Sequence, residues 1–96
     1  MKAIVLNNFG GVENFELKEL PAPTIKDNEV LVDTKAISIN PVDIKTRLGK
    51  GQASALRGQN PMILGWDISG VVAATGAAVT NFKIGDEVFG MINFLF

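Results

Sequence analysis

The sequence contains no cysteine, no histidine and no tyrosine. Without cysteine it can form neither disulfides nor a reactive thiolate. Cysteine and histidine are also the softest zinc ligands, and histidine is the usual proton shuttle near neutral pH. A Ser-His-Asp triad, a Cys-His dyad and a thiolate zinc site are therefore excluded. We predict no metal site, because no loop carries carboxylates at calcium-site spacing.

The chain also lacks an excess of charge and a long hydrophobic run. Nine basic and ten acidic residues leave a formal net charge of -1, so we expect neither nucleic acid nor an anionic membrane as a partner. The apolar run at residues 3–6 is too short for a signal peptide or a membrane span. We therefore expect a cytoplasmic protein.

What is present indicates one domain, residues 1–96, that is mainly β. Hydrophobic residues make up 47% of the chain, which is enough for a packed core. Short apolar or alternating runs separated by glycine and proline predict several strands. These runs lie at residues 2–9, 15–20, 29–39, 68–74 and 88–90, and the apolar residues 91–96 are expected to form a further strand or core segment. A loop is predicted at residues 49–62, and a tight turn at Gly85–Asp86.

In the longest predicted strand, residues 29–39, the apolar residues change face. They begin at Val30 and Val32 and continue at Ile37 and Ile39, on the face that carried charges earlier. A β-bulge would explain this shift, and so would a strand that becomes buried on both faces. We expect burial, because the alternate positions Ala36, Ser38 and Asn40 are small or polar and can border a cleft.

One short helix is predicted from Asn40 to about Leu48. Asn40 suits the N-cap, Pro41 the first helical position, and Asp43 lies three residues after the cap. Asp43 is therefore interpreted as a capping residue rather than a catalytic base.

Five segments, in order, resemble the medium-chain dehydrogenase/reductase superfamily, and its quinone oxidoreductase branch most. They are residues 39–43, 47–49 (Arg-Leu-Gly), 61–72 (Pro-Met-Ile-Leu-Gly-Trp-Asp-Ile-Ser-Gly-Val-Val), Gly76 and 82–90 (Phe-Lys-Ile-Gly-Asp-Glu-Val-Phe-Gly). The resemblance implies a GroES-like, partly open β-barrel and an NADPH-binding Rossmann domain after it. No G-x-G-x-x-G motif is present. The chain is therefore expected to be truncated before that domain.

The chain departs from the zinc-dependent branch of this superfamily at the metal ligands. Asn40 stands where that branch carries a cysteine ligand, Trp66 where it carries a histidine ligand, and Asp67 where it carries glutamate. Amide and indole groups do not replace a thiolate and an imidazole on zinc. The resemblance thus implies a zinc-independent enzyme.

The resemblance implies Asn40 and Trp66 as catalytic residues, and Asn40, Pro41, Lys45 and Asp67 as cofactor-binding residues. Structural alternatives stay open for each side chain. Asn40 can serve merely to cap the helix, without a role in the site. Trp66 can be a buried core residue rather than a wall for a planar substrate. Lys45 or Arg47 can be solvated rather than bound to a cofactor phosphate. Asp67 can cap a turn or orient one of these two cations.

The expected activity is NADPH-dependent reduction of quinones or conjugated carbonyls (enones) by metal-free hydride transfer. Such substrates are already electrophilic and accept hydride with weak polar assistance. The 96 residues alone are expected to be inactive. The alternatives are a stand-alone GroES-like binding module, by analogy of fold alone, and an inactive truncated remnant. Association into a homodimer through an exposed apolar face is a further expectation.

Overall fold

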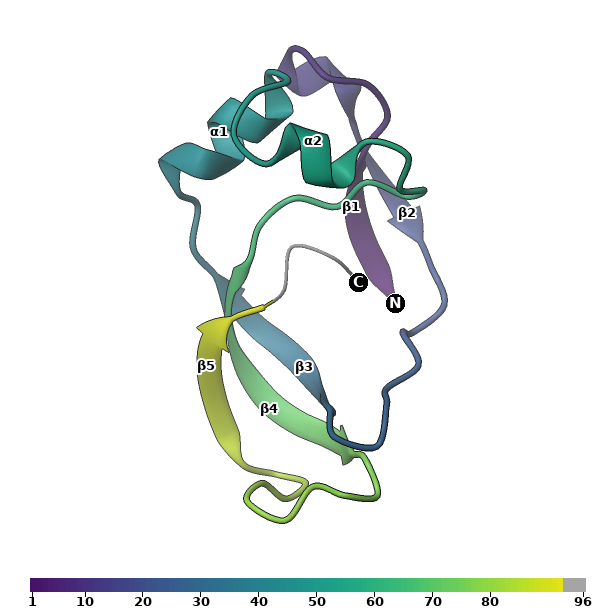
Figure 1. Cartoon of the computed structure of the whole chain (residues 1–96), viewed down its shortest axis with the longest axis vertical. Coiled ribbons are helices and arrows are strands. Elements are labelled where there is room, and N and C mark those ends of the chain that lie inside the picture. Colours follow the sequence, from purple (N-terminus) through teal and green to yellow (C-terminus); the bar gives the residue numbers. More distant parts are fainter. Residues whose placement is uncertain (93–96) are drawn as a thin grey trace. The chain divides into compact units, whose positions relative to one another are not determined.

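The computed structural model describes residues 1–92, in which five strands and two α-helices follow one another along the chain (Figure 1). These residues divide into two compact units. Unit 1 comprises Met1–Pro21 and Ile39–Trp66, and unit 2 comprises Ala22–Ser38 and Asp67–Ile92. Across the described residues, no helix has the length and apolar character needed to cross a lipid bilayer.

Unit 1 combines a two-stranded sheet with both α-helices. Strand β1 (Lys2–Leu6) pairs antiparallel with β2 (Phe15–Glu19), and the short 3-10 helix η1 (Val12–Asn14) lies between them in the chain. Helices α1 (Pro41–Arg47) and α2 (Ala53–Leu56) follow later. The core of unit 1 consists of side chains that are at most 2% exposed, namely Val5, Leu6, Thr46, Ala53, Leu56 and Trp66.

Unit 2 is built on a three-stranded antiparallel sheet of order β3-β4-β5. Its strands are β3 (Val30–Ile37), β4 (Asp67–Thr75) and β5 (Glu87–Met91). The central strand β4 passes very close to β3 at Gly70, where a Cβ atom would collide with the carbonyl oxygen of Asp33. Glycine at this position therefore permits the close pairing of the two strands.

The predicted fold class is confirmed. The chain is mainly β, its one helix of about two turns lies at the predicted place, and neither sheet closes into a barrel within residues 1–92. The segment 49–62 is not entirely a loop, because it contains the single turn α2. The buried side chains of Ala53 and Leu56 explain this, since tertiary packing stabilises a helix too short to form alone.

The prediction that β3 becomes buried on both faces is wrong. Ile37 is 66% exposed and Ile39 is 77% exposed. The register of the β3–β4 ladder instead shifts twice, between Leu31 and Val32 and between Thr34 and Ala36. The first shift leaves an extra residue, Ala73, on β4, and the second leaves an extra residue, Lys35, on β3. The extra residue on β3 produces the change of face in the sequence pattern, because it reverses the alternation of the residues that follow it.

The predictions for the C-terminal region are confirmed in part. Met91 ends β5, and Ile92 follows it outside regular structure. The remainder of the apolar segment, residues 93–96, lies outside the described residues. The predicted turn before β5 is present, since the Asp86 backbone N–H donates to the Lys83 carbonyl oxygen at 3.1 Å, and the Asp86 carboxylate accepts from the Lys83 N–H at 3.0 Å.

The close packing of Gly76 against the segment before β3 can be tested by substitution. A Cβ atom at Gly76 would collide with the carbonyl oxygens of Lys26 and Asp27, whereas one at Gly90 would meet nothing within 4 Å. We expect Gly76→Ala to lower the free energy of unfolding by about 1–3 kcal/mol, as overpacking does. Gly90→Ala, the matched control, should change it by less than about 0.5 kcal/mol. Urea unfolding measures both, and equal midpoints would contradict the packing described here.

Candidate functional site

Three of the predicted site residues lie at α1, two at its start and Lys45 in its last turn. Asn40 is the N-cap in an extended conformation, with φ -121° and ψ 160°, and Pro41 opens the helix. The Asp43 carboxylate accepts a hydrogen bond from the Asn40 backbone N–H at 2.9 Å, and the two residues form a capping box. The interpretation of Asp43 as a capping residue is therefore confirmed. Lys45 lies one turn further along and is exposed.

Hydrogen bonds attach the end of α1 to the rest of unit 1. The fully buried Thr46 hydroxyl donates to the Val42 carbonyl oxygen at 2.6 Å and accepts from the Gln52 backbone N–H at 3.1 Å. Arg47 Nη1 donates to the Gly10 carbonyl oxygen at 2.6 Å, and the Gly10 N–H donates to the Arg47 carbonyl oxygen at 2.8 Å. The Arg47 side chain thus has a structural contact, while Lys45 forms no ion pair within residues 1–92.

Trp66 and Asp67 lie at the boundary between the two units in the sequence. Trp66 is the last residue of its segment of unit 1, and Asp67 is the first residue of β4. The Trp66 side chain is only 2% exposed, so its indole is shielded from solvent. The Asp67 carboxylate accepts a hydrogen bond from the Ser38 hydroxyl at 3.1 Å. No local sequence pattern indicates Ser38 as a partner of Asp67, because 29 residues separate them.

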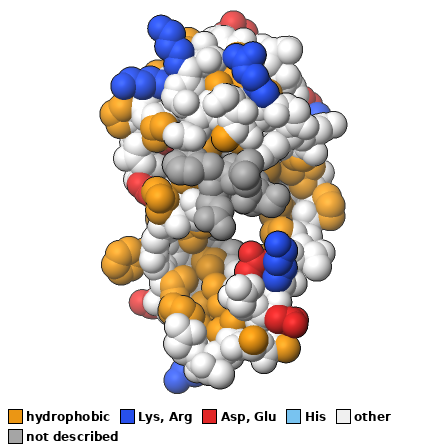
Figure 2. Space-filling model, viewed as in Figure 1, with side chains coloured by type: hydrophobic (Ala, Val, Ile, Leu, Met, Phe, Trp, Pro, Cys, Tyr) orange, Lys and Arg blue, Asp and Glu red, His pale blue; other side chains and the backbone are white. Residues whose placement is uncertain are grey.

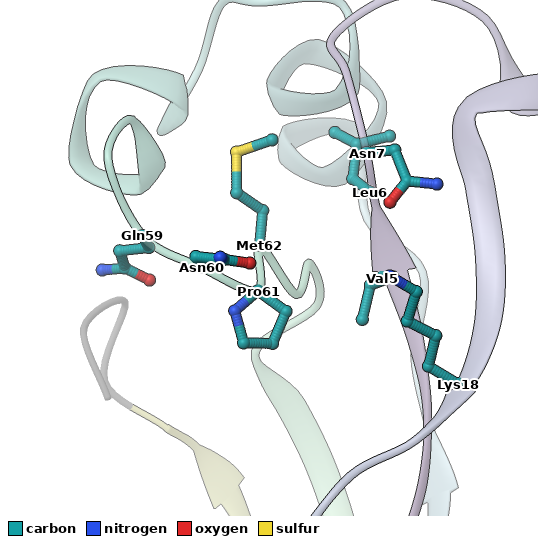
Figure 3. Close-up of a pocket in the computed structure, with 8 residues that line it drawn as sticks. All are labelled: Val5, Leu6, Asn7, Lys18, Gln59, Asn60, Pro61 and Met62. Carbon is teal, nitrogen blue, oxygen red and sulfur yellow. The ribbon is translucent and has the colours of Figure 1, made fainter.

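A small cavity of about 220 Å³ lies beside β1 in unit 1 (Figure 3). Residues of β1 lie on one side of it and the segment after α2 on the other, joined by the hydrogen bond from the Leu6 N–H to the Met62 carbonyl oxygen at 2.9 Å. Its lining residues are Val5, Leu6, Asn7, Lys18, Gln59, Asn60, Pro61 and Met62. None is a predicted site residue, and the cavity is smaller than most ligand sites.

A wider and more open cavity of about 470 Å³ lies on the sheet of unit 2. Lys35, Glu87 and Phe89 are among its lining residues. Phe89 is 89% exposed, and Met91, on the same face two residues later, is 69% exposed. Hydrophobic side chains are also visible at the surface in Figure 2. The sequence pattern does not reveal this surface, because alternation in β5 indicates which residues share a face but not whether that face is covered.

The described residues bring together no group of three or more carboxylate, imidazole or thiol side chains that could hold a metal ion. The side-chain groups available at Asn40 and Trp66 are an amide and an indole. Neither is suited to hold zinc. The amide of Asn40 can instead donate and accept hydrogen bonds, and the planar indole of Trp66 can contact a flat ring.

The fold places the chain in the medium-chain dehydrogenase/reductase superfamily. The solved quinone oxidoreductase from Coxiella burnetii matches with a TM-score of 0.90 and 41% sequence identity, over 95% of this chain and 29% of that one. Residues 26–94 also match the family model described as the alcohol dehydrogenase GroES-like domain. The chain belongs to this GroES-like domain family, and the resemblance found in the sequence is confirmed.

Curated relatives support the same placement. The chain is 39% identical over 94 residues to the chloroplastic NADPH-dependent alkenal/one oxidoreductase of Arabidopsis thaliana, covering 97% of this chain and 24% of the relative. It is 40% identical over 90 residues to the quinone oxidoreductase of Sus scrofa, covering 93% of this chain and 26% of the relative. The chain thus spans about a quarter of the length of these relatives.

The two roles of Asn40 can be separated through stability. Serine caps a helix about as well as asparagine, whereas alanine does not. We expect Asn40→Ala to lower the free energy of unfolding by about 1 kcal/mol and Asn40→Ser to leave it nearly unchanged. Urea unfolding followed by the emission of Trp66, the one tryptophan, measures both variants. Equal stability of the two variants would show that the cap contributes nothing.

Proposed function

We propose that this chain supplies the catalytic GroES-like domain, residues 1–96, of an NADPH-dependent, zinc-independent oxidoreductase that reduces quinones or conjugated carbonyl compounds. The observation that carries the proposal is the pair Asn40 and Trp66, in a chain of this family that has no cysteine and no histidine. The relatives named above as quinone and alkenal/one oxidoreductases support this substrate class.

The residues of this chain fit one side of a nicotinamide site rather than a whole dinucleotide site. All strand pairs within the described residues are antiparallel, so these residues contain no parallel βαβ unit of the kind that binds a dinucleotide. The half-buried Asn40, with Pro41 beside it, would contact the nicotinamide end, and the exposed Lys45 a phosphate or ribose group. A nucleotide-binding domain completes the enzyme, and the 96 residues alone do not turn over.

The reaction requires little of the protein beyond the positioning of the substrate and the cofactor. Bound NADPH supplies the hydride, and the substrate carbonyl conjugated to a double bond is already electrophilic. The Asn40 amide donates a hydrogen bond to the substrate carbonyl or holds the cofactor carboxamide. Trp66, whose side chain is 2% exposed, does not itself meet the substrate and helps to exclude water from this part of the site. A metal ion is not needed to polarise such a substrate, and solvent protonates the reduced product.

The complete enzyme should oxidise NADPH when a quinone or an enone is added, and a strong chelator should not change the rate. Loss of NADPH absorbance measures this reaction directly. The control is the 96-residue chain alone, which should show no turnover under the same conditions. Loss of activity on chelation, with recovery on addition of zinc, would contradict the proposal. Failure to bind any dinucleotide would favour a binding module or an inactive remnant.

We further propose that exposed apolar residues of unit 2 favour a homodimer in the cytoplasm. Phe89 and Met91 lie on one face of β5, which is an edge strand among the described residues, and both are largely exposed. Burial of such residues stabilises association. Sedimentation should detect a concentration-dependent dimer that Phe89→Ser weakens, whereas Val12→Ser, a change at an exposed residue of unit 1, should not. A strictly monomeric chain at all concentrations would contradict this.

A further inference from the structure

Two of the places where the chain passes from one unit to the other are joined by hydrogen bonds. The chain leaves unit 2 after Ser38 and returns to it at Asp67. The Ser38 hydroxyl donates to Asp67 Oδ2 at 3.1 Å, and the Ser38 backbone N–H donates to the Asp67 carbonyl oxygen at 3.3 Å. We call these two residues the Ser38–Asp67 pair. They continue the β3–β4 ladder by one step beyond its last pair, Ile37 and Ile68.

The two bonds of the pair differ in kind. The backbone bond extends the ladder and depends little on the side chains. The bond between the side chains joins a hydroxyl to a carboxylate, and such charge-assisted bonds are stronger than those between neutral groups. The side-chain bond is exposed to solvent, which competes with it. Together with the backbone bond, it restrains the spacing of the two strand ends.

The proposed site residues lie directly beyond this pair in the sequence. Trp66 precedes Asp67, so their Cα atoms are about 3.8 Å apart. Asn40 follows Ser38 by two residues, which places its Cα within about 7 Å of that of Ser38. Any change in the spacing of the strand ends is therefore passed on to both residues through very few rotatable bonds.

We propose that Asp67 is a positioning residue which, through Ser38, sets the spacing between Asn40 and Trp66. This inference rests on the proposed function for its catalytic consequence, and it gives Asp67 a different role from the predicted contact with the cofactor. Displacement of a reacting group by about 1 Å can lower a rate severely, so a restraint at this position affects catalysis without touching substrate.

The variants that test this role are Asp67→Ala and Ser38→Ala, with Asp67→Asn and Ser38→Thr as rescuing variants. Asparagine keeps an acceptor oxygen and threonine keeps the hydroxyl. In the complete enzyme we expect kcat to fall about fivefold in each alanine variant, which corresponds to one net hydrogen bond of about 1 kcal/mol. The Kd for NADPH should not change, and the rescuing variants should recover most of kcat. Asp33→Asn is the matched control, since this exposed carboxylate of β3 pairs only with Lys35 among the described ion pairs, at 2.8 Å.

A second readout does not depend on turnover. Trp66 is the one tryptophan and there is no tyrosine, so the emission of the 96-residue chain is that of Trp66. Because Trp66 is 2% exposed, acrylamide should quench it weakly, and both alanine variants should increase this quenching. Unchanged quenching would overturn the role of the pair, even if NADPH is oxidised. A raised Kd for NADPH would overturn it in favour of a cofactor contact. If the wild-type enzyme does not oxidise NADPH while quenching still responds, the proposed function fails and the positioning role remains.

Discussion

The antiparallel pairing of β3 with β4 is the constraint that holds together the two strand ends from which the chain continues to the proposed site residues. Asn40 lies just after the end of β3 and Trp66 just before the start of β4. The ladder runs to Ile37 and Ile68, and the Ser38–Asp67 pair extends it. Two residues that are 26 positions apart in the sequence therefore emerge from neighbouring strand ends. Gly70 permits this pairing, because any side chain there would collide with the backbone of β3.

The composition of the site agrees with chemistry that does not use a metal. The resemblance to the superfamily implies that Asn40 and Trp66 stand where the zinc-dependent branch carries a thiolate and an imidazole, and this chain has an amide and an indole there. Such groups cannot act as a Lewis acid, but the amide can orient a polarised substrate by hydrogen bonding. The proposed activity needs no more than this, because quinones and enones are activated by their own conjugation.

Much of the fold follows from local patterns. The N-cap and proline at Asn40–Pro41, together with Asp43, predict the start of α1 because capping depends only on residues within one turn. Alternation and glycine turns likewise locate all five strands within a few residues. Two predictions were wrong, one about the burial of a side chain and one about a short helix. Ile37 was expected inside and is exposed, and α2 was missed because four residues carry too little periodicity to indicate a helix.

The candidate site likewise has features that the sequence determines and features that only the tertiary structure decides. Its residue types, and the exclusion of thiolate and imidazole chemistry, follow from the sequence alone, because a chain without cysteine or histidine cannot supply those groups in any fold. The partners of these residues were decided by the tertiary structure. The contacts of Asp67 with Ser38 and of Arg47 with Gly10 join residues 29 and 37 positions apart. Only the strand register and the packing of α1 bring such distant residues within hydrogen-bonding distance, and no local pattern encodes that proximity.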